Sequence, residues 1–127
     1  MRPGQTRPNE FELAVLERIA EDAPWLMGPF DSLHVLSREF TGVGCFTRFV
    51  CDAAGDGEAR QPGLGTLIRM PGVPNGMGAV LLCKGASPEC LEVFTFGDDH
   101  WDGVYDGFSF DRTAQPRAAA DPAPPRR

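Results

Sequence analysis

Two apolar runs separated by a short polar turn dominate the hydrophobic pattern of residues 76–97. Residues 79–82 are apolar without interruption, and the second run, residues 91–96, is rich in aromatic and branched side chains. Two such runs joined by a turn predict a β-hairpin. Because the first strand is apolar on both faces, we expect it to be central in a sheet and covered on part of each side.

A helical spacing of apolar residues follows Asn9 near the start of the chain. The residues with this spacing are Phe11, Val15, Leu16, Ile19 and Ala20. Asn9 and Glu12 have the form of an N-cap followed by an acidic third position, which satisfies backbone donors at the start of a helix. Pro24 disfavours helix in the residue before it. The pattern predicts a helix over residues 10–22.

Three strands are expected between the helix and the hairpin, over residues 32–40, 45–51 and 65–70. The connections between strands are too short for crossover helices, which favours an antiparallel sheet. After residue 97 the chain is acidic and aromatic, and we expect its aromatic side chains to pack against a sheet face. The sequence predicts an α+β fold, with an N-terminal helix packed on a largely antiparallel sheet of about five strands in two layers.

With 127 residues, the chain is expected to form one domain. Residues 1–8 are polar and contain two prolines, and residues 112–127 contain Pro, Ala and Arg with almost nothing to bury. Both segments are predicted to be flexible tails. The single domain is therefore expected over residues 9–111.

No stretch approaches the roughly 20 apolar residues that span a bilayer, and residues 1–8 lack the apolar segment of a secretory signal. We therefore predict a cytoplasmic protein without membrane contact.

The chain has four cysteines, which are expected to be reduced thiols. They are Cys45, Cys51, Cys83 and Cys90. They lack the spacing of a zinc finger. The first two are expected to share a strand face, and the last two to be cross-strand neighbours.

The predicted domain is strongly acidic. Between Asn9 and Asp111 the sequence has 17 acidic and six basic residues, a net charge of −11, compared with −6 for the whole chain. An acidic domain repels the phosphate backbone, so nucleic-acid binding is not expected. Complementary charge favours association with a basic protein partner. Acidity that only keeps the protein in solution is the alternative interpretation.

Two segments resemble a group of small bacterial proteins. They are S-R-E-F-T-G-V-G-C-F over residues 37–46 and L-E-V-F-T-F over residues 91–96. The group shares an S-R-E-[FY]-T-G-x-G hairpin and a later L-E-x-[FY]-T-[FY] strand, and the resemblance covers about residues 33–101. This chain differs at Cys45 and Val93, where the group has an aromatic or aliphatic residue and a glycine. Because the group has no established activity, the resemblance implies the fold and transfers no catalytic residue.

Arg38 and Glu39 are neighbours in a predicted strand and must face opposite sides of the sheet. One of them is therefore expected on the helix-covered face or at its margin. A pair between that residue and Glu92, or between Arg38 and Glu92, would be a partly buried ion pair that fixes the strand register. Contact with a partner or ligand remains open, as does acid–base chemistry by a buried carboxylate with a raised pKa.

Asp98, Asp99, His100 and Asp102 form the densest group of potential metal ligands. Their spacing is a poor match to a calcium loop, because His100 occupies the third position and Ser109 the twelfth. A transition-metal site with His100 and two carboxylates is chemically possible. A solvated acidic loop is the simpler interpretation, and no metal or cofactor is predicted.

The leading functional hypothesis is a small protein-interaction module, an inhibitor or immunity-type protein by analogy, that binds a more basic protein. It would use its acidic loops and the exposed sheet face or edge. The residues expected to bind are Arg38, Glu39, Glu92, Phe94, Phe96, Asp98, Asp99, His100, Trp101, Asp102 and Tyr105. No catalytic residue is predicted, because the chain has only two histidines and no G-x-S-x-G motif.

Two alternatives remain open. The first is a small hydrolase or metal-assisted enzyme, and its functional residues would be Glu39, Glu92, Asp98 and His100. The second is a sheet that binds a small ligand in an apolar cleft lined by Phe94, Phe96 and Trp101. The sequence leaves the oligomeric state undecided.

Overall fold

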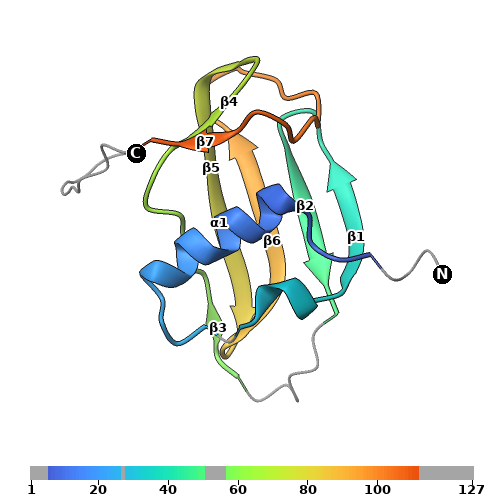
Figure 1. Cartoon of the computed structure of the whole chain (residues 1–127), viewed down its shortest axis with the longest axis vertical. Coiled ribbons are helices and arrows are strands. Elements are labelled where there is room, and N and C mark those ends of the chain that lie inside the picture. Colours follow the sequence, from blue (N-terminus) through green and yellow to red (C-terminus); the bar gives the residue numbers. More distant parts are fainter. Residues whose placement is uncertain (1–5, 27, 51–56, 112–127) are drawn as a thin grey trace.

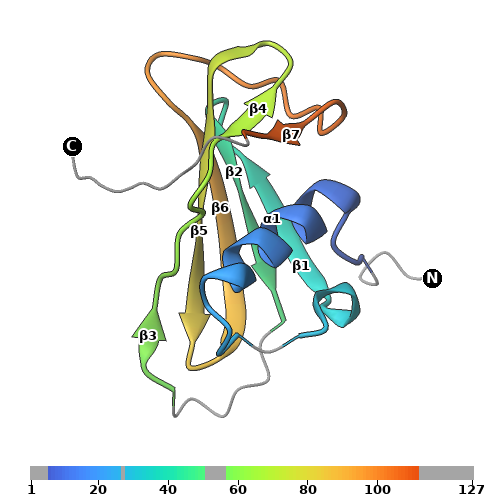
Figure 2. The ribbon, with the colours of Figure 1, turned by 60° about the vertical axis from the view of Figure 1, so that its left-hand side comes forward.

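The computed structural model describes residues 6–26, 28–50 and 57–111, and in them a helix lies across one face of a sheet (Figure 1). The helices are α1 (Glu10–Glu21) and the short 3-10 helix η2 (Phe30–Ser32). The strands are β1 (Val35–Phe40), β2 (Gly44–Phe49), β3 (Ala59–Arg60), β4 (Ile68–Met70), β5 (Val73–Lys84), β6 (Ser87–Thr95) and β7 (Ser109–Phe110). Figure 2 shows α1 on one side of the sheet, which gives a two-layer fold.

The described strands form one antiparallel sheet in the order β1-β2-β6-β5-β4-β7, and β3 pairs with β5 beside this path. The 12-residue strand β5 pairs with β6, β4 and β3. The predicted central position of this strand is confirmed. Its Met77, Ala79 and Leu81 are at most 5% exposed, because their side chains lie on the face of the sheet that α1 covers.

The α+β class and the antiparallel sheet are confirmed, but the prediction of about five strands was too low, since the described residues form seven. The strands that were missed, β3 and β7, have two residues each. Two residues are too few to show an alternating pattern, and their pairing with β5 and β4 depends on tertiary contacts. β5 also begins at Val73, three residues before the predicted hairpin over residues 76–97, because Val73 pairs with Met70 across a tight turn.

The segment before β1 also differs from its prediction. Residues 30–32 form η2, so β1 begins at Val35 and not at residue 32. The Thr6 carbonyl accepts a hydrogen bond of 2.8 Å from the Val35 N–H, and Pro8 is buried. Residues 1–5 and 112–127 of the predicted tails, and Cys51, lie outside the described residues.

Helix α1 forms where the apolar spacing predicted it, and Asp22 is its C-cap. The capping box is confirmed, because Asn9 Oδ1 accepts a hydrogen bond of 2.8 Å from the Glu12 N–H and the Asn9 N–H donates one of 2.9 Å to Glu12 Oε1. The apolar stripe of Val15, Leu16 and Ile19 is fully buried against the sheet. In the described part of the chain, no helix has the length and apolar character needed to cross a membrane.

The aromatic segment after residue 97 closes the core at one end of α1, as expected. Trp101 is 5% exposed, and its ring centroid lies 6.2 Å from that of Phe11 and 5.7 Å from that of Phe40. The Tyr105 ring is 5.3 Å from that of Phe11. These contacts join the closing segment to the first turn of the helix and to the end of β1.

Candidate functional site

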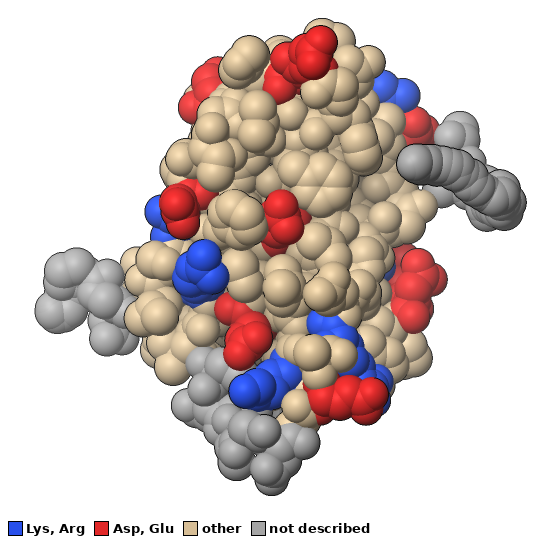
Figure 3. Space-filling view, turned by 180° about the vertical axis from the view of Figure 1, so that it is seen from behind, with Lys and Arg blue, Asp and Glu red and all other residues tan. Residues whose placement is uncertain are grey.

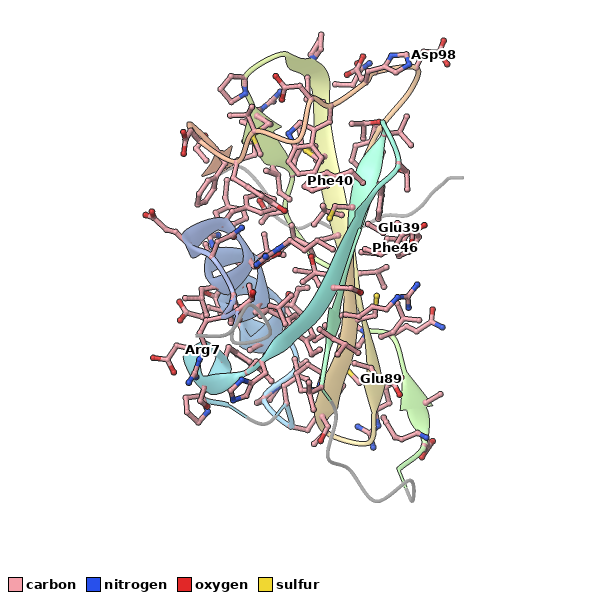
Figure 4. All side chains as sticks on the ribbon, turned by 90° about the vertical axis from the view of Figure 1, so that its right-hand side faces the viewer. Arg7, Glu39, Phe40, Phe46, Glu89 and Asp98 are labelled. Carbon is pink, nitrogen blue, oxygen red and sulfur yellow. The ribbon has the colours of Figure 1, made fainter. Side chains whose placement is uncertain are left out.

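The face of the sheet turned away from α1 has no layer packed on it among the described residues, and we call it the outer face. Side chains alternate between the two faces along each strand, and the cross-strand pairs align those of the outer face in rows. The register of β1, β2, β6 and β5 places in one row Glu39, Phe46, Glu92 and Val80, and in the next Ser37, Arg48, Cys90 and Leu82. Figure 4 shows Glu39, Phe46 and Glu89 on the side away from α1.

An aromatic pair covers bare backbone at one end of the outer face. Phe94 pairs with Gly44 on one side and with Gly78 on the other. The Phe94 and Phe96 rings meet edge to face with centroids 5.6 Å apart. A Cβ at Gly78 would lie 2.8 Å from the Phe96 ring and 2.9 Å from the Phe94 ring. The absence of a side chain at position 78 therefore lets both rings approach the β5 backbone closely, and Phe96 remains 42% exposed.

The charged groups of the outer face stand among these apolar side chains. Arg48 lies over the Phe46 ring, 5.8 Å from its centroid. Its Nη2 atom is 4.0 Å from Glu39 Oε1, and the two side chains are 51% and 66% exposed, so this ion pair contributes little to stability. Glu92 is half-buried between Phe46 and Val80. In the part of the chain that the structure describes, Glu92 forms no ion pair.

Space-filling Figure 3 looks onto the outer face. It shows a broad area of uncharged side chains in which single acidic and basic residues stand apart. The apolar side chains of this face include the exposed Phe96 and the half-buried Phe46 and Phe94. Large exposed apolar patches rimmed by polar groups mark interaction sites. The predicted candidates Glu39, Glu92, Phe94 and Phe96 all belong to this face.

Arg38 lies on the opposite, inner face. Its side chain donates hydrogen bonds of 2.8 Å to Glu12 Oε2 and 2.6 Å to Glu12 Oε1. The prediction that Arg38 and Glu39 face opposite sides, one of them toward the helix, is confirmed. The proposed pairing of Arg38 with Glu92 was wrong, because the two side chains point to opposite faces of the sheet.

The Glu12 carboxylate is fully satisfied although its side chain is only 1% exposed. Besides Arg38 and the Asn9 N–H, it accepts a hydrogen bond of 2.9 Å from Thr47 Oγ1. The hydrogen bond from Arg38 to Glu12 raises the pKa of the guanidinium. We name Glu12, Arg38 and Thr47 the inner charge cluster. It locks α1 to β1 and β2, which is a structural role.

The inner charge cluster continues toward Tyr105 through a buried thiol. Cys45 Sγ lies 3.8 Å from Thr47 Oγ1 and 4.0 Å from the Tyr105 hydroxyl. Burial raises the pKa of Tyr105. A hollow of about 500 Å³ beside Tyr105 is lined by Asn9, Glu10, Phe11, Asp106, Gly107 and Phe108.

Two carboxylates of the predicted acidic cluster are engaged in hydrogen bonds within the protein, Asp99 to the start of β5 and Asp102 within its own turn. Asp99 accepts hydrogen bonds from the Asn75 N–H at 2.7 Å and from the Asn75 side-chain amide at 3.2 Å. Asp102 accepts one of 3.0 Å from the Val104 N–H. Asp98 and His100 are exposed, and Figure 4 places Asp98 beyond the end of the sheet, away from Glu39. His100 and Asp102 line a separate hollow of about 340 Å³ with Trp101, Gly42, Pro71, Gly72 and Val73.

The residues of the enzyme hypothesis do not form one group. Glu39 and Glu92 are separated by the whole of β2, with Phe46 between them, a separation of about 9–10 Å between backbones. The described residues contain no group of three or more His, Cys, Asp or Glu side chains placed to hold a metal ion. The apolar cleft predicted for Phe94, Phe96 and Trp101 does not form either, because Trp101 packs with Phe11 on the inner face.

The predicted cross-strand contact between two cysteines was also wrong. Cys90 pairs with Leu82, and Cys83 pairs with Pro88, because the β5–β6 register shifts after Leu82. Cys83 joins the core under α1, whereas Cys90 lies beside Arg48. Burial raises the pKa of the Cys90 thiol, which disfavours its reactive thiolate form.

Comparisons with protein-family models, curated proteins and solved structures found no match. The resemblance to the group of small bacterial proteins therefore stays a prediction. The chemistry of the outer face favours a binding function, because the half-buried rings of Phe46 and Phe94 lie beside Glu92, a carboxylate without an ion-pair partner among the described residues.

Proposed function

We propose that the protein is a protein-binding module whose outer face associates with a more basic protein, as an inhibitor or immunity protein would. The observation that carries this proposal is the uncovered sheet face, on which Phe46, Phe94 and Phe96 stand among carboxylates. Aromatic side chains at the centre of a patch are the residues that most often dominate binding energy. The net charge of −11 between Asn9 and Asp111 supports a basic partner, since complementary charge speeds and selects association.

The acidic loop contributes less than the sequence indicated. Asp99 and Asp102 accept hydrogen bonds from backbone N–H groups of the protein, Trp101 belongs to the core, and the partly buried Tyr105 packs against it. These four residues are therefore withdrawn from the proposed binding surface, as is Arg38, whose guanidinium binds Glu12 on the inner face. The candidates that remain are Glu39, Glu92, Phe94, Phe96, Asp98 and His100, to which the structure adds Phe46, Arg48, Val80 and Leu82.

Affinity capture with matched surface variants tests the proposal. The full chain is immobilised and exposed to native lysate of its source at low and high salt. Hydrogen exchange of the chain then shows which of its residues a captured partner covers. Phe96→Ser removes an exposed ring from the outer face, and Val104→Ser, which is 52% exposed on a loop, is the control. We expect a basic partner that protects β2 and β6 from exchange, and about tenfold weaker capture by Phe96→Ser.

Recovery of no partner at either salt would contradict the proposal. So would equal capture by Phe96→Ser and the wild-type chain, because an outer-face interface requires the exposed ring. Protection confined to the loop around Val104 would place the interface elsewhere on the molecule.

A further inference from the structure

Glu92 differs from the other acidic residues of the sheet in its surroundings. It lies on β6, an inner strand, and is half-buried between Phe46 on β2 and Val80 on β5. Phe94 and Cys90, two positions away along β6, share its face. The only basic residue in the neighbouring row, Arg48, forms its ion pair with Glu39. The Glu92 carboxylate therefore stands in an apolar setting without a cation of its own among the described residues.

A partner that covers this face changes the energetics of Glu92. Covering the carboxylate removes the water that solvates it, and an isolated buried charge is strongly unfavourable. The loss is offset only if the partner brings a positive group to the same place. An apolar partner surface would therefore be rejected at Glu92, and a cationic side chain would be selected.

We propose that Glu92 is the anchor for an arginine side chain of the partner, with the guanidinium held between the carboxylate and the aromatic rings of Phe46 and Phe94. This inference rests on the proposed function. A guanidinium fits because its planar fork binds a carboxylate through two hydrogen bonds and its face stacks on aromatic rings. Arg48 already places a guanidinium over the Phe46 ring. An ammonium group binds a carboxylate as a point charge and stacks less well.

Charge also selects among possible occupants. A second copy of the chain would bring another net charge of −6 to the interface, and this repulsion disfavours self-association. The arginines at positions 112, 117, 126 and 127 of the same chain carry the right charge. A separate basic protein is the occupant we propose, and the two others are distinguishable outcomes of the test.

The test uses N-acetyl-L-arginine amide as the probe, titrated into the ¹⁵N-labelled full chain and followed by amide chemical shifts. We expect saturable shifts in the millimolar range centred on the amides around Glu92, Phe46 and Phe94. The neutral analogue N-acetyl-L-citrulline amide should give none, and N-acetyl-L-lysine amide should give weaker ones. Glu92→Gln should weaken the arginine probe about tenfold or more, the effect of losing a charge-assisted pair.

Two matched variants control for the loss of one negative charge. Glu89→Gln changes a carboxylate on the same strand and on the same side of the sheet, and Glu17→Gln changes an exposed carboxylate on α1. Both should bind the probe as the wild-type chain does. Equal weakening by all three variants would mean that the probe responds only to net charge, which overturns the anchor.

The remaining outcomes separate this inference from the proposed function. If the wild-type chain captures a basic partner and the Glu92→Gln variant captures it equally well, the anchor is wrong and the proposed function stands. If no partner is captured, the proposed function fails whatever the probe does. A concentration-dependent rise in mass by sedimentation, lost in Glu92→Gln, would assign the face to a second copy and overturn the inference. If the probe binds only to a chain that carries Arg117→Ala, Arg126→Ala and Arg127→Ala together, the outer face is occupied by the chain's own arginines. This result would also overturn the inference.

Discussion

The two faces of the sheet each carry a glutamate in an apolar setting, and the two carboxylates have opposite surroundings. Glu12 reaches the inner face from α1 with a side chain only 1% exposed, and Arg38, Thr47 and the Asn9 N–H satisfy it. Glu92 on the outer face is half-buried and forms no ion pair within the described residues. The difference separates a charge that holds the fold together from one that is available to another molecule.

Solvent access explains why both arrangements are tolerated. A carboxylate that is removed from water must have all its hydrogen bonds supplied by the protein, so Glu12 has a complete set. Glu92 keeps part of its hydration, and the folded chain can leave it without a cation. A buried ion pair such as Glu12–Arg38 is weak evidence for net stabilisation, but the loss of one partner leaves an uncompensated buried charge. The inner charge cluster joins three elements, α1, β1 and β2, whereas the exposed Arg48–Glu39 pair of the outer face joins only β1 and β2.

The largest effect is expected from Glu12→Ala. It leaves the Arg38 guanidinium without its carboxylate, removes the capping box and strands the Thr47 hydroxyl, so the free energy of unfolding should fall by about 3 kcal/mol or more. Urea denaturation measures this loss. Glu17→Ala, an exposed change on the same helix, should stay within about 0.5 kcal/mol, and replacing Glu12 and Arg38 together by Met should recover part of the loss. A loss below about 1 kcal/mol for Glu12→Ala would show that the inner charge cluster does not lock the layers.

A smaller loss is expected from Gly78→Ala on the outer face. The new methyl group would lie 2.8 Å from the Phe96 ring and 2.9 Å from the Phe94 ring, so both rings must move off β5. Overpacking of this kind costs about 1–3 kcal/mol of unfolding free energy. Gly63→Ala is the control, because its methyl group would meet only the Ala79 carbonyl, at 3.7 Å. Equal effects of the two substitutions would show that the aromatic pair is not seated on Gly78.

The burial of Tyr105 predicts how stability depends on pH at the alkaline end. Burial raises the folded-state pKa of Tyr105 above its usual value of 10, so the folded chain retains a proton that the unfolded chain releases. The contribution of Tyr105 to stability is thus complete below pH 10 and is lost as the pH rises above it. Tyr105 is the chain's one tyrosine, and absorbance of the phenolate near 295 nm reports it directly. A titration midpoint at or below pH 10 in the folded protein would contradict the raised pKa of the partly buried Tyr105.

The elements with a strong local pattern were predictable from sequence, and those decided by tertiary contacts were not. The apolar spacing and capping box of α1 and the two apolar runs of β5 and β6 lie within short stretches, so their patterns were sufficient. β3 and β7 have two residues each and exist only because β5 and β4 offer them a partner. Gly97, with a φ of 65°, turns the chain so that Trp101 packs on the inner face, away from Phe94 and Phe96.

The candidate site was predictable only in part, because sequence gives the face of a residue but not its partner. The alternation of β1 correctly separated Arg38 from Glu39, whereas the partner of Arg38 was missed. Glu12 had been explained as a helix cap, and it performs that role as well as binding Arg38. A signal was present, since Glu12 falls at helical spacing with the buried Val15, Leu16 and Ile19. A carboxylate on the apolar stripe of a helix therefore predicts a basic residue on the sheet face that the helix covers.

The smallest effect on stability is expected from Glu92→Gln, and this small effect sharpens the comparison with Glu12. Because Glu92 forms no ion pair within the described residues and keeps part of its exposure, removing its charge breaks no contact that holds the fold. The free energy of unfolding should change by less than about 0.5 kcal/mol. Urea denaturation of Glu12→Gln beside Glu92→Gln makes the comparison with the same chemical change on both faces. A loss for Glu92→Gln as large as that for Glu12→Gln would mean that Glu92 belongs to the folded core, and the carboxylate would then no longer be available to a partner.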